Sequence, residues 1–204
     1  ASSYRGGPLR EPHDIPVHRF RYAPRWMETL THDQSVPDRI RHRPAMAALV
    51  PGYLAAGRHA AAALGREGVD VAHVHWPMPH ALFGAAMRRA SGGRTAVLCS
   101  FYSLELNWVR HRMPWLRPFL DWTIRSADGV TAISSSTAEA VRSLVDRPVA
   151  VVPYAAPLPE FPDRPRRPAL SDPEAPVRLL FVGRLVERRG LTSRDDDDLS
   201  GRPD

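Results

Sequence analysis

Four short apolar segments, separated by stretches of helical character, constrain the fold of this chain more than any other feature. They are residues 69–76, 95–101, 129–133 and 149–152. Continuous apolar strands that alternate with helices are typical of a parallel sheet with helices on both faces. The sequence therefore predicts an α/β fold of the Rossmann-like, doubly wound kind, with these four strands adjacent and parallel.

Helices are expected before and between these strands. They span residues 45–66, with a break at Pro51-Gly52, and then 81–90, 117–126 and 137–145. Ser136 precedes Glu139 by three residues, the spacing of a capping box at the start of the last helix. Apolar and polar residues alternate over residues 15–22, which predicts a further strand with one exposed face.

A proline-rich segment divides the chain. Residues 159–176 contain six prolines, which is typical of a semi-rigid linker between domains. We therefore expect a first domain over residues 1–158 and the start of a second domain over residues 177–190. An acidic, irregular tail is expected over residues 191–204, where four aspartates follow one another.

Composition excludes several classes of protein. The single cysteine, Cys99, excludes an intrachain disulfide framework and a four-cysteine zinc site. No run of 18 apolar residues is found, so no spanning helix is expected. Through residue 190 the chain has 26 arginines against 17 acidic residues, a net charge of +9 that favours phosphates, acidic lipid surfaces or nucleic acid as partners.

Four motifs, in the correct order, resemble family-4 retaining glycosyltransferases of the GT-B fold. Residues 178–190 (RLLFVGRLVERRG) are similar to the opening of that family's C-terminal domain. The segments similar to its N-terminal domain are 70–76 (DVAHVHW), 127–134 (ADGVTAIS) and 151–161 (VVPYAAPLPEF). The resemblance implies transfer of a sugar from a nucleotide-sugar donor to a glycan or lipid-linked acceptor. It implies a cytoplasmic enzyme that needs neither a metal nor another cofactor.

The resemblance also implies where the donor diphosphate binds. In the family, an Arg in the Gly-Arg turn and a Lys five residues later contact it. The matching residues are Arg184 and Arg189, and Gly183 of the same turn is included in the candidate donor-phosphate site. Fixed cations would stabilise the charge that develops on the leaving nucleoside diphosphate. The alternative is that both arginines are solvated turn residues.

The family's N-terminal domain usually has a histidine in a T-x-H-G-x-D/E turn near the reacting sugar. Tyr102 occupies the histidine position, Ser103 the glycine position and Glu105 the acidic position. Tyr102 and Glu105 are therefore the candidate catalytic residues. A tyrosine can hydrogen-bond a sugar hydroxyl or a phosphate, but it does not titrate near neutrality. A half-buried tyrosine at a strand end is the alternative.

His73 and His75 alternate along a predicted strand and so share one face. Two histidines with this spacing could bind a metal, but no third ligand is evident near them, and no metal is expected. His75 stands at the carboxyl end of its strand, where doubly wound sheets bind ligands. His75 and Ser134 are therefore cleft candidates, and two packed histidines are the alternative.

Trp108, Trp115 and Trp122 recur every seven residues among several arginines. Such residues could contact the inner face of an anionic membrane or stack on nucleic-acid bases. Pro114 and Pro118 prevent one continuous helix through all three. Core packing of one or two of these tryptophans is the favoured interpretation, and no nucleic-acid partner is expected.

Two family features are not found in the chain: the first strand with its glycine-rich loop, and the E-x7-E motif of the second domain. We therefore expect a fragment with little or no activity by itself. One alternative is a noncatalytic α/β module whose basic face binds phosphorylated or nucleic-acid partners, with a steep salt dependence for a polynucleotide. Another is a different GT-B-like enzyme, such as a phosphorylase or an epimerase.

Overall fold

The computed structural model describes residues 16–31 and 36–155 of the 204-residue chain. The chain separates into two units, residues 1–156 and residues 157–204, and all the described residues belong to the first. The predicted linker, the predicted start of a second domain over residues 177–190 and the acidic tail lie outside the described residues. The domain assignments made from the sequence therefore stay predictions.

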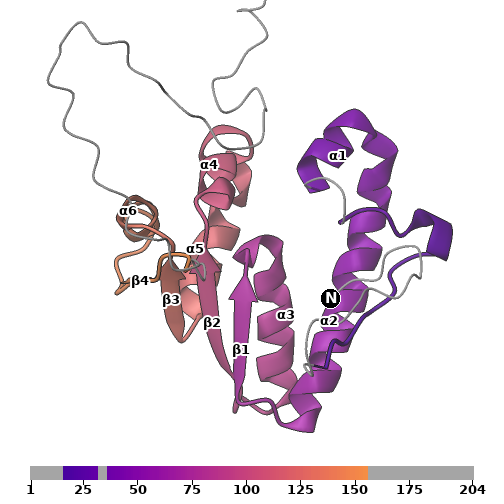
Figure 1. Ribbon diagram of the computed structural model, residues 1–204, viewed down its shortest axis with the longest axis horizontal. Coiled ribbons are helices and arrows are strands. Elements are labelled where there is room, and N and C mark those ends of the chain that lie inside the picture. The colour runs from indigo at the N-terminus through magenta and orange to yellow at the C-terminus, as the bar shows by residue number, and fades with distance from the viewer. Residues whose placement is uncertain (1–15, 32–35, 156–204) are drawn as a thin grey trace, which may run out of the picture. The chain divides into compact units, whose positions relative to one another are not determined.

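The first unit contains a four-stranded, all-parallel sheet in the order β1-β2-β3-β4 (Figure 1). The strands are β1 (Val71–His75), β2 (Ala96–Phe101), β3 (Gly129–Ala132) and β4 (Ala150–Val151). The register places Val74 opposite Cys99 and Cys99 opposite Val130. The prediction of four adjacent parallel strands in a Rossmann-like α/β fold is confirmed.

Six α-helices are described: α1 (Val36–His42), α2 (Val50–Glu67), α3 (Pro77–Ala90), α4 (Leu104–His111), α5 (Arg117–Ser126) and α6 (Ser135–Arg142). Three short 3-10 helices accompany them: η1 (Arg25–Met27), η2 (Pro44–Leu49) and η3 (Pro114–Leu116). The predicted break at Pro51 is present, because η2 precedes Pro51 and α2 begins with it in the first turn. The sequence prediction missed α1 and α4.

One face of the sheet forms the core. Its buried strand residues include Val74, Val97, Cys99, Phe101 and Val130, and they pack in one cluster with side chains of α4, α5 and α6. Helix α3 approaches the same face through Gly84, where an added Cβ would lie 2.9 Å from Val74 Cγ2. Glycine is therefore needed for this close contact between helix and sheet.

The other face of β1 is exposed. Ala72 and Val74 are buried, whereas Val71, His73 and His75 point to the opposite face and are exposed. The apolar run predicted a strand buried on both faces, and β1 differs because two of its alternate residues are histidines. Polar side chains are therefore accessible beside the carboxyl end of this strand.

The strand predicted over residues 15–22 is wrong for the residues described there. Residues 16–22 contain a single bridge residue, Phe20, and no strand. The alternating aromatic residues pack on helices instead: the rings of Phe20 and Tyr22 each lie 5.5 Å from that of Tyr53 in α2. Phe20 also lies 6.0 Å from Phe83 in α3. Burial of these rings, not sheet pairing, explains the alternation.

The capping box predicted at Ser136 and Glu139 is also wrong. Ser134 is the N-cap of α6, in an extended conformation directly after β3, and its Oγ accepts a hydrogen bond from Thr137 N at 3.3 Å. Ser136 lies inside the first turn, where its backbone is already helical. The cap falls two residues earlier because the chain enters the helix immediately after the strand.

Candidate functional site

Aromatic and polar side chains gather where the strands end. In a parallel sheet all carboxyl ends meet at one edge, which is where such folds bind ligands. Here Trp76 follows β1, Tyr102 follows β2, and Ser134 and Tyr154 come soon after β3 and β4. The candidate site is this carboxyl edge of the sheet.

His75 and Tyr102 join the first two strands at this edge. His75 Nδ1 and the Tyr102 hydroxyl form a hydrogen bond, and their ring centroids are 5.9 Å apart. Burial raises the pKa of Tyr102 above its ordinary value of 10.0, so the phenol stays protonated and can donate a hydrogen bond at neutral pH. The structure therefore brings together two residues that the sequence selected separately.

A row of polar groups extends from His75 across the exposed face. The rings of His73 and His75 are 4.0 Å apart, which confirms that they share a face. His73 Nε2 lies 2.7 Å from Ser100 Oγ, which lies 2.6 Å from Thr131 Oγ1. Burial and the neighbouring His75 lower the pKa of His73, so its ring is neutral at physiological pH. Within the described ranges, no group of three His, Cys, Asp or Glu residues could hold a metal ion.

Three aromatic rings stack in a column that we call the aromatic column: Trp76, Tyr102 and Tyr154. The Trp76 and Tyr102 centroids are 5.0 Å apart with an interplanar angle of 15°. Tyr102 and Tyr154 are 5.5 Å apart at 26°. Trp76 is 41% exposed and Tyr154 is 73% exposed, so the two ends of the column meet solvent while Tyr102 lies between them.

Glu105 holds the turn that carries Tyr102. Its side chain is buried, and Oε1 accepts a hydrogen bond from the backbone N–H of Tyr102 at 2.7 Å. Oε2 has no hydrogen-bond partner among the described residues. Burial raises the pKa of Glu105, although the Tyr102 N–H acts in the opposite direction. The direct contact of this carboxyl is therefore with the Tyr102 backbone.

Ser103 adopts an unusual backbone conformation between these two residues. It is the N-cap of α4, with φ 69° and ψ −33°, and its side chain makes no capping hydrogen bond. A positive φ is strained for any residue with a Cβ. This position matches the glycine of the turn that the sequence resembles, and the conformation explains why glycine suits it.

The other predicted site residues are placed differently. Ser134 Oγ is engaged within α6, because it also lies 3.0 Å from Thr137 Oγ1 and 3.2 Å from Ser136 Oγ. Gly183, Arg184 and Arg189 lie outside the described residues. The structure therefore brings together three of the predicted residues, which are His75, Tyr102 and Glu105.

Sequence reasoning missed Trp76 and Tyr154. Both stand just beyond an apolar strand, Trp76 directly after His75 and Tyr154 after Pro153. The rule that ligands bind at the carboxyl ends of parallel strands selected His75, and it applies equally to these two aromatic residues. The signal was present, but it was applied to His75 and Ser134 and not to these two aromatic residues.

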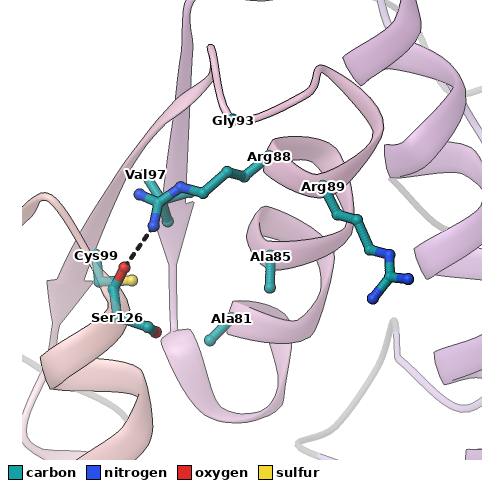
Figure 2. A pocket seen from close by; sticks show the side chains of 8 residues that line it. All are labelled: Ala81, Ala85, Arg88, Arg89, Gly93, Val97, Cys99 and Ser126. Carbon is teal, nitrogen blue, oxygen red and sulfur yellow. Dashed lines mark hydrogen bonds between the residues drawn. The ribbon is translucent and has the colours of Figure 1, made fainter.

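A cavity of 390 Å³ lies on the covered face between α3 and β2 (Figure 2). Arg88 points across it, and its guanidinium donates to Ser126 O at 2.7 Å and Thr95 O at 3.3 Å and pairs with Asp128. Cys99 is buried beside it, and burial raises the pKa of its thiol to about 11. Arg88 is therefore engaged with the protein, and the Cys99 thiol stays protonated and unreactive.

A basic groove of 560 Å³ runs between α2 and α3. Arg58, His59 and Arg66 come from α2 and Arg89 from α3, with alanines between them. Arg89 also lines the Arg88 cavity, and Figure 2 shows its side chain extending in a different direction from that of Arg88. None of these three arginines forms an ion pair with another described residue. This groove is therefore a basic concave surface between α2 and α3.

The three regularly spaced tryptophans do not pack in the core. Trp115 is 72% exposed and Trp122 38% exposed, and Trp108 is half-buried. The core prediction is wrong because Pro114 opens the separate 3-10 helix η3, which carries Trp115 on an exposed turn. Arg110, Arg112 and Arg117, which flank Trp115 in the sequence, are also exposed. In the described part of the chain no helix combines the length and hydropathy needed to cross a bilayer.

Comparison with known families gives one match. The sequence model of the family described as Glycosyltransferase Family 4 matches residues 9–158, which is more than half of the chain. The matched region includes the whole described sheet and the carboxyl edge. No curated protein matches the chain.

Proposed function

The chain belongs to glycosyltransferase family 4, and on this premise we propose that it acts in the transfer of a sugar from a nucleotide-diphosphate sugar to a glycan or lipid-linked acceptor. The observation that carries the proposal is the meeting of His75, Tyr102 and Glu105 at the carboxyl edge of the matched domain. Retention of the sugar's anomeric configuration is part of the proposal.

Each of the three residues has a separate proposed role. The Tyr102 hydroxyl binds a hydroxyl of the reacting sugar or an oxygen of the phosphate, because it is a protonated donor at the open edge. His75 orients that hydroxyl through its Nδ1 contact. Glu105 fixes the Tyr102 backbone through Oε1. Its Oε2 has no partner among the described residues and would bind an acceptor hydroxyl if the turn opens.

The donor diphosphate is proposed to bind at Gly183, Arg184 and Arg189. Backbone at a glycine can approach a phosphate closely, and two guanidinium groups would offset the charge on the leaving diphosphate. Arg189 presents a planar fork where the family has an ammonium group, so it would contact two oxygens instead of one. Neither a metal nor another cofactor is needed in this scheme.

Titration of UDP, GDP and dTDP into the 204-residue chain tests the donor site. Two charge-assisted contacts of about 1.5–3 kcal/mol each, reduced by the cost of ordering the turn, predict a dissociation constant on the order of millimolar. Arg184→Ala should abolish this binding, with Arg94→Ala as the matched control. Binding that Arg184→Ala leaves unchanged would remove the residue assignment, and absence of binding would remove the transferase proposal. Sugar transfer is measured in the same samples with the corresponding nucleotide sugars. We expect it to be weak in this chain.

We also propose a peripheral contact with an anionic membrane on the cytoplasmic side. Trp115 is exposed, and so are Arg110, Arg112 and Arg117, which flank it in the sequence. Tryptophan with arginine suits the boundary between headgroups and acyl chains. Only one acidic side chain of α5 lies near this surface, Asp121, which is 4.0 Å from Arg117. A lipid-linked acceptor would then be reached at the membrane surface.

The basic groove supports a second candidate, a noncatalytic module that binds a phosphorylated or nucleic-acid partner. Arg58, Arg66 and Arg89 face the groove without ion-pair partners among the described residues. A polynucleotide held there would lose affinity steeply with salt, by a slope of about 0.7–0.9 per phosphate contacted. Binding of single-stranded DNA with such a slope, together with no nucleotide binding, would favour this candidate over the transferase.

A further inference from the structure

Trp76 is held in a conformation that a tryptophan rarely adopts. It directly follows β1 and precedes α3, with φ 56° and ψ 68° in the left-handed region. This region is strained for a residue with a Cβ, and it persists only where the surroundings enforce it. The position of the Trp76 indole therefore depends on the interactions that hold this backbone conformation.

Two hydrogen bonds in series fix the Trp76 backbone. His80 Nδ1 lies 2.9 Å from Trp76 O, and His80 Nε2 lies 3.0 Å from the hydroxyl of Tyr53. Burial raises the pKa of Tyr53 to about 12 and lowers the pKa of His80. Tyr53 therefore donates its O–H to Nε2, and the neutral His80 donates from Nδ1–H to the Trp76 carbonyl.

The conformation places the Trp76 indole on the aromatic column. One face of the indole stacks on Tyr102, and the side chain is 41% exposed. His75, the neighbour of Trp76 in sequence, hydrogen-bonds the same tyrosine. A flat apolar surface therefore lies beside hydrogen-bonding groups at the edge where ligands of this fold bind.

A sugar ring matches this combination. The axial C–H bonds on one face of a pyranose are apolar and weakly positive, so they suit the negative face of an indole. The hydroxyls around the ring need donors and acceptors, which His75 and Tyr102 offer. A nucleobase would also stack on an indole, and the probes used below separate the two because they have a pyranose ring and neither base nor phosphate.

We propose that Trp76 is the platform on which the pyranose ring of the acceptor stacks, and that His80 and Tyr53 are the positioning residues that hold it there. This inference rests on the proposed transferase function and deepens it, because it assigns the acceptor side of the site. Trp76 thereby determines that the acceptor presents a sugar ring with an unsubstituted apolar face.

Saturation-transfer NMR on the 204-residue chain tests the platform. The probes are the methyl pyranosides of glucose, galactose, mannose and N-acetylglucosamine, because the method detects millimolar binding. We expect saturation of the ring C–H protons of at least one probe, reduced at least fivefold in Trp76→Asn and partly retained in Trp76→Phe. Asparagine tolerates the left-handed conformation, so Trp76→Asn removes the ring without adding strain. Trp26→Ala, at another exposed tryptophan, should leave the signal unchanged.

Tyr53→Phe tests the positioning pair. The substitution removes the hydroxyl that donates a hydrogen bond to His80 Nε2. The aromatic ring at position 53 stays packed against Phe20 and Phe83. We expect a weaker near-ultraviolet circular-dichroism band from the Trp76–Tyr102 stack and at least a twofold loss of the pyranoside signal. Tyr22→Phe removes another hydroxyl of the same aromatic cluster, which contacts Leu30 N and not His80, and should change neither.

The outcomes separate this inference from the proposed function. No pyranoside signal on the wild-type chain, or an equal signal in Trp76→Asn, overturns the platform. An unchanged band and signal in Tyr53→Phe overturns the positioning role. Nucleotide titration reports on Arg184 and needs no contact at Trp76, so its failure beside a Trp76-dependent sugar signal would remove the transferase proposal and keep the sugar platform.

Discussion

Glu105 Oε1 accepts a hydrogen bond from the backbone N–H of Tyr102 at 2.7 Å, so a buried carboxyl fixes the turn that follows β2. The same turn contains Ser103 at a positive φ and presents the Tyr102 hydroxyl to His75. The position of the proposed ligand-binding hydroxyl therefore depends on the carboxyl and on the strained backbone between the two residues.

The titration of Glu105 should be visible in the pH dependence of stability. Burial raises its pKa in the folded protein above the ordinary value of 4.5. A raised folded pKa contributes stability that is complete below the unfolded pKa and is lost as the pH rises through the folded pKa. Glu105→Gln keeps an acceptor for Tyr102 N–H and removes the titration. The wild-type Tm should therefore fall relative to that of Glu105→Gln as the pH rises from about 4.5 towards neutrality.

Thermal unfolding at several pH values checks this expectation. Glu139→Gln, at an exposed carboxyl of α6, is the control and should show no such trend. A Tm difference between wild type and Glu105→Gln that stays constant across the range would contradict the burial of a titrating carboxyl at this turn.

Ser103→Gly should stabilise the fold. Relief of the strained backbone gains about 1–2 kcal/mol, and the greater freedom of glycine in the unfolded chain costs about 0.5–1 kcal/mol. We expect a net gain of about 0.5–1 kcal/mol in urea unfolding. Ser135→Gly, at a position with helical backbone in α6, should instead lose about 0.5 kcal/mol. Destabilisation by both substitutions to a similar degree would show that Ser103 is not strained.

Binding to vesicles tests the surface around Trp115. Each arginine near an anionic membrane contributes about 1 kcal/mol, so Arg112→Gln should lower partitioning onto phosphatidylglycerol vesicles about fivefold at low salt. Trp115→Ala should lower it further by removing the apolar anchor. Trp26→Ala is the matched control, because Trp26 is 77% exposed on a different element. Equal loss in Trp26→Ala, or no binding by the wild type, would contradict a specific membrane contact.

The sheet could be predicted because its strands are short apolar runs that differ clearly from their flanks. The burial of Val74, Val97 and Val130 follows from that pattern alone. The strand expected at residues 15–22 could not be distinguished in this way. The alternation of Phe20 and Tyr22 fits a half-buried strand equally well, and only the contacts with Tyr53 and Phe83 decide against it.

Site residues could be predicted where their position in the sequence identified them. They could not be predicted where their placement depends on tertiary contacts. The strand-end rule identified His75. The turn that resembles the family's T-x-H-G-x-D/E motif identified Tyr102 and Glu105. The column through Trp76 depends on a positive φ held by His80 and Tyr53, which lie on two helices. Local sequence carries no signal for such a tertiary constraint. The exposure of Trp115 likewise depends on where η3 turns the chain.

Photoaffinity labelling tests most directly the claim that the carboxyl edge is the site of sugar transfer. UDP-glucose and GDP-mannose that carry a diazirine on the sugar are irradiated with the 204-residue chain, and the labelled peptides are identified by mass spectrometry. The account predicts labels at residues 75–76 and 102–105, suppressed by excess unmodified nucleotide sugar and reduced in Tyr102→Phe. Labels confined to residues 55–66 and 86–90 would place the ligand in the basic groove between α2 and α3 and would contradict the account.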